Sequence, residues 1–271
     1  MLATVAEAAR VLPRQQATIT GALPPINETY YKMATRSGEF LLTALRPEGH
    51  LCRSWRGGQV TNAVFLEDYA ALILGLLELY QTDFNNRWFA SALELADEMI
   101  SRFNDPNGGF FDTPIDGESL VIRPKDLQDN AIPSGNALAT EALLKLAAFT
   151  DNGSYRDLAE RALKTMGEAA IRYPTAFARW LSVADFALEN AKQIAVMGEA
   201  QADNFQALLQ IVRSAYRPNV VVAASPFPPA EDVPALLRER PLLEDKPTAY
   251  VCEGFVCRQP VNDPDKLRQQ L

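Results

Sequence analysis

Two aspartates, Asp68 and Asp129, are the best candidates in this sequence for acid–base chemistry. Each stands at the start of a predicted apolar helix, where free N–H groups and the helix dipole favour negative charge. Glu67 adjoins Asp68, but successive side chains on a helix point about 100° apart, so only one can face a cleft, and we assign that place to Asp68. Glycoside hydrolysis requires two carboxylates roughly 5–9.5 Å apart. A structural interpretation stays open: Glu67 or Asp68 caps its helix, and Asp129 or Asn130 fixes a loop.

Other polar and aromatic residues at the same helix starts, and in the loops before them, suit a hydroxyl-rich ligand. Charged and amide groups form paired hydrogen bonds with sugar hydroxyls, and an aromatic face packs against the C–H groups of a sugar ring. The candidate binding residues are Arg53, Trp55, Glu67, Tyr69, Arg123, Lys125, Asn130, Asn136 and Arg179.

Several other chemistries are disfavoured by residue type and spacing. His50 is the single histidine, so a mechanism or metal site that needs two imidazoles within this chain is excluded. Ser134 lacks the G-x-S-x-G context of a nucleophile and is predicted to cap a helix. Residues 105–112 lack calcium-loop spacing and predict a turn. The segment 196–199 carries one glycine and no phosphate-binding loop. We therefore predict no metal and no cofactor.

Composition narrows the expected partners and compartment. Lys and Arg total 26 and Asp and Glu total 34, for a net charge of −8. Nucleic acids and anionic membranes bind clustered basic residues, so we expect neither as a partner. No stretch reaches the ~18 consecutive apolar residues of a membrane helix, and the first residues do not read as a signal peptide. We expect a cytoplasmic protein.

The three cysteines agree with a reducing compartment, because three are too few for a disulfide framework. Cys252 and Cys257 lie on one predicted strand, 249–257, and their spacing places the two side chains on opposite faces. We therefore expect Cys52, Cys252 and Cys257 to be reduced.

Two kinds of predicted helix alternate along the first 190 residues. Helices 66–80, 134–149 and 177–188 are apolar on nearly every face, whereas 88–103 and 154–172 each carry a single apolar stripe. A helix that is apolar all round is buried, and one with a single stripe lies outside. The alternation predicts a mainly α fold, a partial (α/α) toroid of inner and outer helices. Two more helices are predicted at 1–12, ended by Pro13, and at 28–45.

The pattern changes after residue 190. Strands at 193–197 and 219–224 flank a helix at 202–215, which predicts a parallel β-α-β unit. We therefore divide the chain into a toroid-like part, 1–190, and a small α/β appendage, 191–271. Asp116-Gly117 between two short runs predicts a hairpin over 110–123. Residues 49–58 form a loop or short hairpin, and the segment around Pro24-Pro25 follows the first helix.

A series of motifs resembles one known family along nearly the whole chain. In order they are FLEDYA (65–70), GGFFDT (108–113), RPKD (123–126), DNAIPSGN (129–136), RYPTAF (172–177) and CEGFVC (252–257). Together they resemble the C-terminal region of the YyaL-type proteins, whose animal member is called a spermatogenesis-associated protein. The resemblance implies a thioredoxin-like domain followed by a six-hairpin (α/α) region, similar to N-acylglucosamine 2-epimerases and six-hairpin glycosidases.

This sequence departs from that pattern because the thioredoxin-like domain has no counterpart in it. Seven helices are predicted, whereas the six-hairpin ring that the resemblance implies has twelve. We therefore expect a half-toroid that a companion polypeptide or self-association completes, since bare inner helices would expose a large apolar patch. Two functions stay open: a carbohydrate-binding or carbohydrate-active arc (epimerase- or glycosidase-like) and a non-catalytic interaction module.

Overall fold

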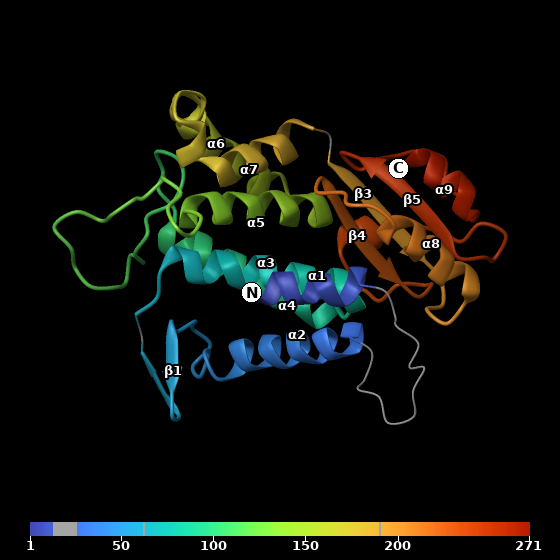
Figure 1. Cartoon of the computed structure of the whole chain (residues 1–271), viewed down its shortest axis with the longest axis horizontal. Helices are drawn as coiled ribbons and strands as arrows, with labels where there is room; N and C mark the ends of the chain where they lie inside the picture. The colour runs from blue at the N-terminus through green and yellow to red at the C-terminus, as the bar shows by residue number, and fades with distance from the viewer. Residues whose placement is uncertain (13–25, 62, 190) are drawn as a thin grey trace.

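Helices in two rows make up most of the computed structural model, which describes residues 1–12, 26–61, 63–189 and 191–271 (Figure 1). Four of them pack side by side in an inner row: α1 (Leu2–Val11), α3 (Leu66–Asp83), α5 (Gly135–Thr150) and α7 (Ala178–Leu188). Three others, α2 (Ile26–Thr43), α4 (Asn86–Phe103) and α6 (Gly153–Arg172), pack outside the inner helices that precede them. The predicted Pro24-Pro25 segment and the helix stop at Pro13 lie outside the described residues.

The helical hairpins α3–α4 and α5–α6 turn in the same way. α3 ends at Phe84 and α5 at Asp151, and both residues adopt left-handed backbone angles (φ 56° and 57°). The next residue, Asn85 or Asn152, accepts a backbone N–H of the following helix through its side chain. A left-handed C-cap followed at once by an asparagine N-cap reverses the chain within two residues, which fixes each outer helix against its inner partner.

The burial of α3 and α5 agrees with the prediction that these two helices lie in the inner row. Both helices are buried on nearly every face, including Leu72 and Leu144. α7 differs from the prediction, because only Trp180, Val183 and Phe186 are buried along it. It is the last helix of the row and has neighbours on one side, so its other apolar side chains face outward, with Leu188 at 84% exposure.

A small α/β part lies at the C-terminal ends of the inner helices (Figure 1). Its sheet has the order β4-β3-β5-β6, built from β3 (Lys192–Met197), β4 (Val220–Ser225), β5 (Thr248–Glu253) and β6 (Val256–Cys257). β3 and β4 pair in parallel through α8 (Asp203–Arg213), which confirms the predicted β-α-β unit. A final helix, α9 (Pro264–Gln270), packs on α8.

The apolar core passes without interruption from the helices into one face of the sheet, where Ala195, Met197 and Val221 belong to it. α8 covers the other face through Phe205 and Leu208. The boundary predicted at residue 190 falls on Asn190, which lies outside the described residues. Among the described helices, none combines the length and apolar character that crossing a bilayer requires.

The expectation of reduced thiols at Cys252 and Cys257 is wrong. The predicted strand 249–257 is two strands, because Gly254 and Phe255 both have positive φ and form a two-residue turn between β5 and β6. The turn makes Cys252 and Cys257 cross-strand partners on one face, and they form a disulfide. Cys52 is free and buried.

The hairpin predicted over 110–123 is also wrong. The backbone N–H groups of Phe111 and Ile115 donate instead to carbonyls at the end of α4, at Phe103 and Arg102. This long loop therefore folds over the end of α4, and its two arms are joined by a hydrogen bond from the N–H of Asp112 to the carbonyl of Pro124 rather than by paired strands. A short hairpin forms earlier, from β1 (Ser54–Arg56) and β2 (Gln59–Thr61); β1 lies within the segment 49–58, where a loop or short hairpin was expected, and β2 follows directly after it.

Candidate ligand-binding site

A hollow of about 360 Å³ lies at the N-terminal ends of α3 and α5, where the sequence predicts a site. We call it the mouth pocket. Arginine, carboxylate and amide groups line it together: Arg53, Glu67, Asp112, Asp126, Gln128 and Asn130. Its volume falls within the range of small-molecule sites.

Arg53 organises the acidic residues at the start of α3. Its guanidinium pairs with Glu67 Oε1 at 2.8 Å and with Asp68 Oδ2 at 3.1 Å, and it stacks over the ring of Phe65. Asp68 Oδ2 also accepts the N–H of Phe65, the N-cap residue of α3, at 2.9 Å, which is a capping interaction at the start of the helix. Glu67 lines the mouth pocket and Asp68 does not, the reverse of the orientation predicted.

Asp112 is the acid in the mouth pocket with the clearest electrostatic signature. Burial raises its pKa, and the charges of Asp126 and Glu67 raise it further. Its Oδ2 accepts the backbone N–H of Asp126 at 2.7 Å, and its carbonyl accepts the N–H of Leu66, the first residue of α3. The loop thus carries a carboxyl group that is held in place and has a raised pKa, a property suited to proton donation.

Asp129 is placed as a double helix cap. Its Oδ1 accepts the N–H of Ser134 at 2.9 Å and its Oδ2 accepts the N–H of Arg179 at 2.8 Å, which joins the starts of α5 and α7. The Ser134 hydroxyl accepts the N–H of Ala137, so the predicted N-cap is confirmed. Asp129 does not line the mouth pocket, whereas the adjacent Asn130 does. The structure therefore does not bring Asp68 and Asp129 together in this hollow.

Three other predicted residues hold the loop in place. Asn136 is fully buried, and its amide exchanges two hydrogen bonds with the backbone of Phe110. Lys125 pairs with Asp105 at 2.9 Å and donates to the carbonyl of Gly108. Arg123 donates to the carbonyls of Arg102 and Thr113.

Gly109 explains why the loop can approach α5 so closely. Its φ of +72° lies in the left-handed region, and a Cβ there would come within 2.9 Å of Asn136 Oδ1.

The remaining predicted residues lie elsewhere. Tyr69 is buried toward the outer row, where its hydroxyl donates to Glu98 and accepts from Arg102. Burial raises its pKa, and Glu98 raises it further. Trp55 packs edge-on against Phe40 of α2, with ring centroids 5.5 Å apart. His50 is largely exposed, with Nδ1 at 2.9 Å from Glu98 Oε1. No cluster of three metal-ligating side chains occurs in the described ranges.

Arg179 belongs to a second and larger hollow of about 940 Å³, which we call the basin. The basin lies between the inner row and residues 212–222 of the α/β part. Sequence analysis missed it, although a signal was present: Glu78, Glu141 and Lys145 are charged residues within otherwise apolar helices. Asp112 of the mouth pocket was not predicted as a site residue, because a hairpin was expected over 110–123, and Gln128 was not predicted either.

Comparison with known proteins gives relatives over most of the chain. Human spermatogenesis-associated protein 20 is 35% identical over 233 residues, which cover 81% of this chain and 29% of the human protein. The mouse protein gives the same identity and coverage, and an uncharacterized protein of Caenorhabditis elegans is 26% identical over 94% of the chain. No family model matches. The chain spans less than a third of the length of the human and mouse relatives. Over that segment it is homologous to the spermatogenesis-associated protein 20 family.

Proposed function

We propose that the chain is a carbohydrate-binding arc of helices whose mouth pocket holds a neutral sugar. The observation that carries the proposal is the gathering of Glu67, Asp112 and Asp126 with an arginine and two amides at the ends of two inner helices. Carboxylates accept from hydroxyl groups and amides both accept and donate, so this set can satisfy adjacent hydroxyls on one ring.

The same pocket supports a specific division of roles if a reaction takes place there. Asp112 is the proton donor, because its raised pKa keeps the carboxyl group protonated to a higher pH than an exposed aspartate. Glu67, which pairs with Arg53 at 2.8 Å, is the carboxylate that accepts a proton or stabilises positive charge. Asp68 and Asp129 position the helix starts in this proposal and do not contact the sugar.

Calorimetric titration with a panel of neutral sugars tests the proposal. We expect at least one sugar to bind with a Kd near or below about 1 mM, and Glu67→Gln and Asp112→Asn to weaken binding about tenfold or more. Glu118→Gln, an exposed carboxylate on the same loop, is the matched control and should bind normally. Absence of binding to every sugar, or equal weakening by the control, would overturn the assignment.

We also propose that further helices, on a companion polypeptide or a second copy, pack beside α7 and extend the rows. Two observations support this: the human and mouse relatives are more than three times as long as the matched segment, and Leu181 and Leu188 on α7 expose apolar surface. Such a companion would carry the preceding helices and the thioredoxin-like domain that the family resemblance implies.

Sedimentation and co-expression test this second proposal. We expect the chain alone to self-associate, and Leu181→Glu with Leu188→Glu to make it monomeric. Co-expression with a polypeptide that corresponds to the preceding part of the human relative should give a stable complex. A monomeric wild-type chain that also fails to bind that polypeptide would contradict the proposal.

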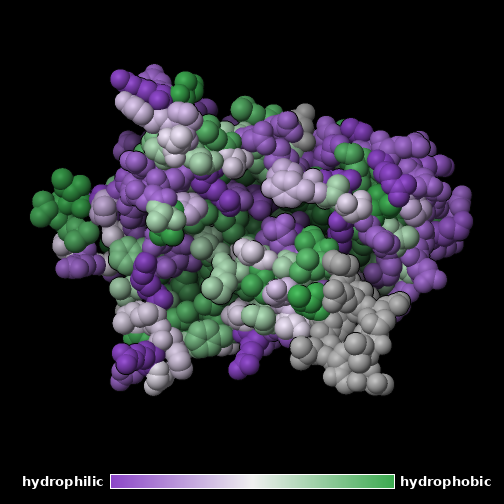
Figure 2. Space-filling model, viewed as in Figure 1, coloured by the Kyte–Doolittle hydropathy of each residue, from purple (hydrophilic) through white to green (hydrophobic). Residues whose placement is uncertain are grey.

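A specific observation favours the interaction module as the alternative function. The long loop after α4 projects from the molecule, on the left in Figures 1 and 2, and Val121 and Ile122 at its tip are 103% and 80% exposed. The interaction module is the correct function if two results are found together: no sugar binds, and the double variant Val121→Ser, Ile122→Ser no longer forms the complex with the companion polypeptide.

A further inference from the structure

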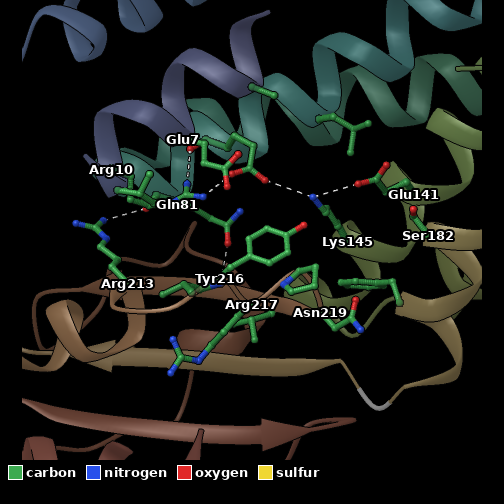
Figure 3. A pocket seen from close by; sticks show the side chains of 18 of the residues that line it. Glu7, Arg10, Gln81, Glu141, Lys145, Ser182, Arg213, Tyr216, Arg217 and Asn219 are labelled. Carbon is green, nitrogen blue, oxygen red and sulfur yellow. Dashed lines mark hydrogen bonds and ion pairs between the residues drawn. The ribbon is translucent and has the colours of Figure 1, made fainter. Parts of the chain in front are cut away.

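The basin is bounded on one side by charged residues from all four inner helices. Arg10 of α1 pairs with Glu78 of α3 at 2.8 Å, and Lys145 of α5 lies 3.3 Å from Glu78 Oε1 and 3.2 Å from Glu141 Oε1. Arg179 of α7 pairs with Glu141 at the far end. These five residues form a continuous row of alternating charge, which we call the charge ladder. Figure 3 labels three of them: Arg10, Lys145 and Glu141.

The middle of the charge ladder is buried, and the charged forms of Glu78 and Lys145 are favoured there. The side chains of Glu78 and Lys145 are only 14% and 15% exposed. Burial by itself would raise the pKa of Glu78, but Lys145 and Arg10 lower it below the usual value. Burial by itself would lower the pKa of Lys145, but Glu78 and Glu141 raise it. Groups locked in their charged forms are poorly suited to proton transfer and well suited to holding a charged ligand.

The ladder favours a negative ligand because its charges do not cancel. It contains three cations and two carboxylates, and both ends of the row are guanidinium groups. Lys145 has three N–H donors, of which Glu78 and Glu141 engage two. Arg179 Nε is buried and has no hydrogen-bond partner in the described structure. Donors for an additional anion are thus in place at the Lys145–Arg179 end.

The opposite wall offers a flat face and polar groups. Tyr216 is 84% exposed as a residue, and its ring stands across the basin from Lys145 (Figure 3). Beside it, Asn219 donates to Asp185 of α7 at 2.9 Å, which places an amide and a carboxylate at the rim. An exposed aromatic ring over a charged hollow fits a ligand with a ring and an acidic group.

We infer that the basin is a second binding site, independent of the mouth pocket, for a small organic anion that carries a hydroxylated ring. Its carboxylate or phosphate group binds Lys145 and Arg179, which are directional donors for such groups. Its ring packs on Tyr216, and its hydroxyls contact Asn219 and Asp185. A purely structural ladder would tie the four helices together but would not discriminate among ligands by charge.

Calorimetric titration of the full chain with four probes tests the inference: glucuronate, glucose 6-phosphate, inorganic phosphate and glucose. Near neutral pH and low salt we expect glucuronate or glucose 6-phosphate to bind at least tenfold more tightly than glucose. Binding should weaken as salt is added, because the contact is between charges. Phosphate alone should bind more weakly than glucose 6-phosphate, because it lacks the ring that packs on Tyr216.

Two variants and two matched controls locate the site. Arg179→Gln and Tyr216→Ala should each weaken binding about tenfold or more. Arg172→Gln and Tyr173→Ala remove the same groups from the exposed end of α6, outside the basin, and should leave binding unchanged. Circular dichroism confirms that each variant is folded.

Three results would overturn the inference. The first is no heat or thermal shift with any anion at about 10 mM, where even a Kd in the millimolar range is detected. The second is equal affinity for glucose and glucuronate. The third is binding that Arg179→Gln and Tyr216→Ala leave unchanged. Failure of neutral sugars at the mouth pocket affects none of these results, so the two sites are tested separately.

Discussion

The mouth pocket lies at the N-terminal ends of α3 and α5, whereas the basin lies between the inner row and the α/β part, and the two sites manage buried charge in opposite ways. In the mouth pocket the acids dominate, and Asp112 responds to burial with a raised pKa. In the basin every buried carboxylate of the charge ladder has cationic partners, and the pKa of Glu78 is lowered. The same set of helices therefore supports one site where the pKa of a carboxyl group is raised and another where the pKa of a carboxyl group is lowered.

The helix ends themselves contribute to this difference. Glu67 and Asp68 lie in the first turn of α3, and Arg10 lies in the last turn of α1. The N-terminal end of a helix carries partial positive charge and favours acids, whereas the C-terminal end favours bases. Because the inner helices run in the same direction, the starts of α3 and α5 lie together at the mouth pocket, away from the end of α1 that carries Arg10 (Figure 1).

The largest expected effect breaks the charge ladder. Lys145→Met removes the cation shared by Glu78 and Glu141 and leaves both carboxylates with one partner fewer. We expect a loss of about 3–5 kcal/mol in the free energy of unfolding, as for other broken buried ion pairs, measured by urea denaturation. Lys164→Met on the exposed face of α6 is the control. A loss of under about 1 kcal/mol would show that the ladder is not tightly coupled.

A smaller effect is expected where an amide holds the mouth loop. Asn136→Ala leaves the buried N–H and carbonyl of Phe110 without their partners. We expect a loss of about 2 kcal/mol in unfolding free energy and faster hydrogen exchange at Phe110 than elsewhere in the core. Asn130→Ala, at an exposed position nearby, should change neither quantity. Unaltered exchange in Asn136→Ala would mean that the loop is held by other contacts.

The smallest effect is expected at Asp112, and its pH dependence is opposite in sign to that of Glu78. The folded-state pKa of Asp112 is raised, so its contribution to stability increases as pH falls through that pKa. The folded-state pKa of Glu78 is lowered. Its contribution to stability is therefore fully present above the pKa of the unfolded chain and is lost as pH falls through the folded-state pKa. Asp112→Asn should raise the Tm near neutral pH by no more than about 2 °C. Glu78→Gln should lower it.

Scans between neutral pH and about pH 3 provide the check, because an ordinary aspartate becomes protonated in that range. The difference in Tm between each variant and the wild type should become smaller as the pH is lowered toward about 3. A Tm for Asp112→Asn below that of wild type near neutral pH would contradict the raised pKa.

Local pattern predicted most helices, the parallel β-α-β unit and the cap at Ser134, because those features depend on residues close in sequence. α7 was different: its composition is as apolar as that of α5, but burial depends on neighbours that composition does not specify. The Gly254-Phe255 turn was missed because only its glycine is a turn residue, while the disulfide depends on that turn.

The candidate site was predicted in place but not in detail. Helix starts identified Glu67, Asn130 and Arg53 of the mouth pocket. Asp112 lines the pocket only because hydrogen bonds from Asn136 and Asp126 hold a long loop over the end of α4. Hydrogen bonds between residues far apart in the sequence produce no periodic pattern from which they could be predicted. The residues of the charge ladder come from four separate helices, so only their isolation among apolar neighbours could have identified them.

Two buried glutamines determine how the basin can change shape. Gln81 of α3 accepts the N–H of Val222 in β4 at 3.0 Å, and Gln193 of β3 donates to the carbonyl of Ala148 in α5 at 3.0 Å. Both hydrogen bonds join a helix to the sheet. Rotating the sheet away from the helices would break them and leave buried amide groups without hydrogen-bond partners. The width of the hollow is therefore set when the chain folds. A ligand in the basin would therefore be selected by its fit to walls that the fold holds at a fixed distance.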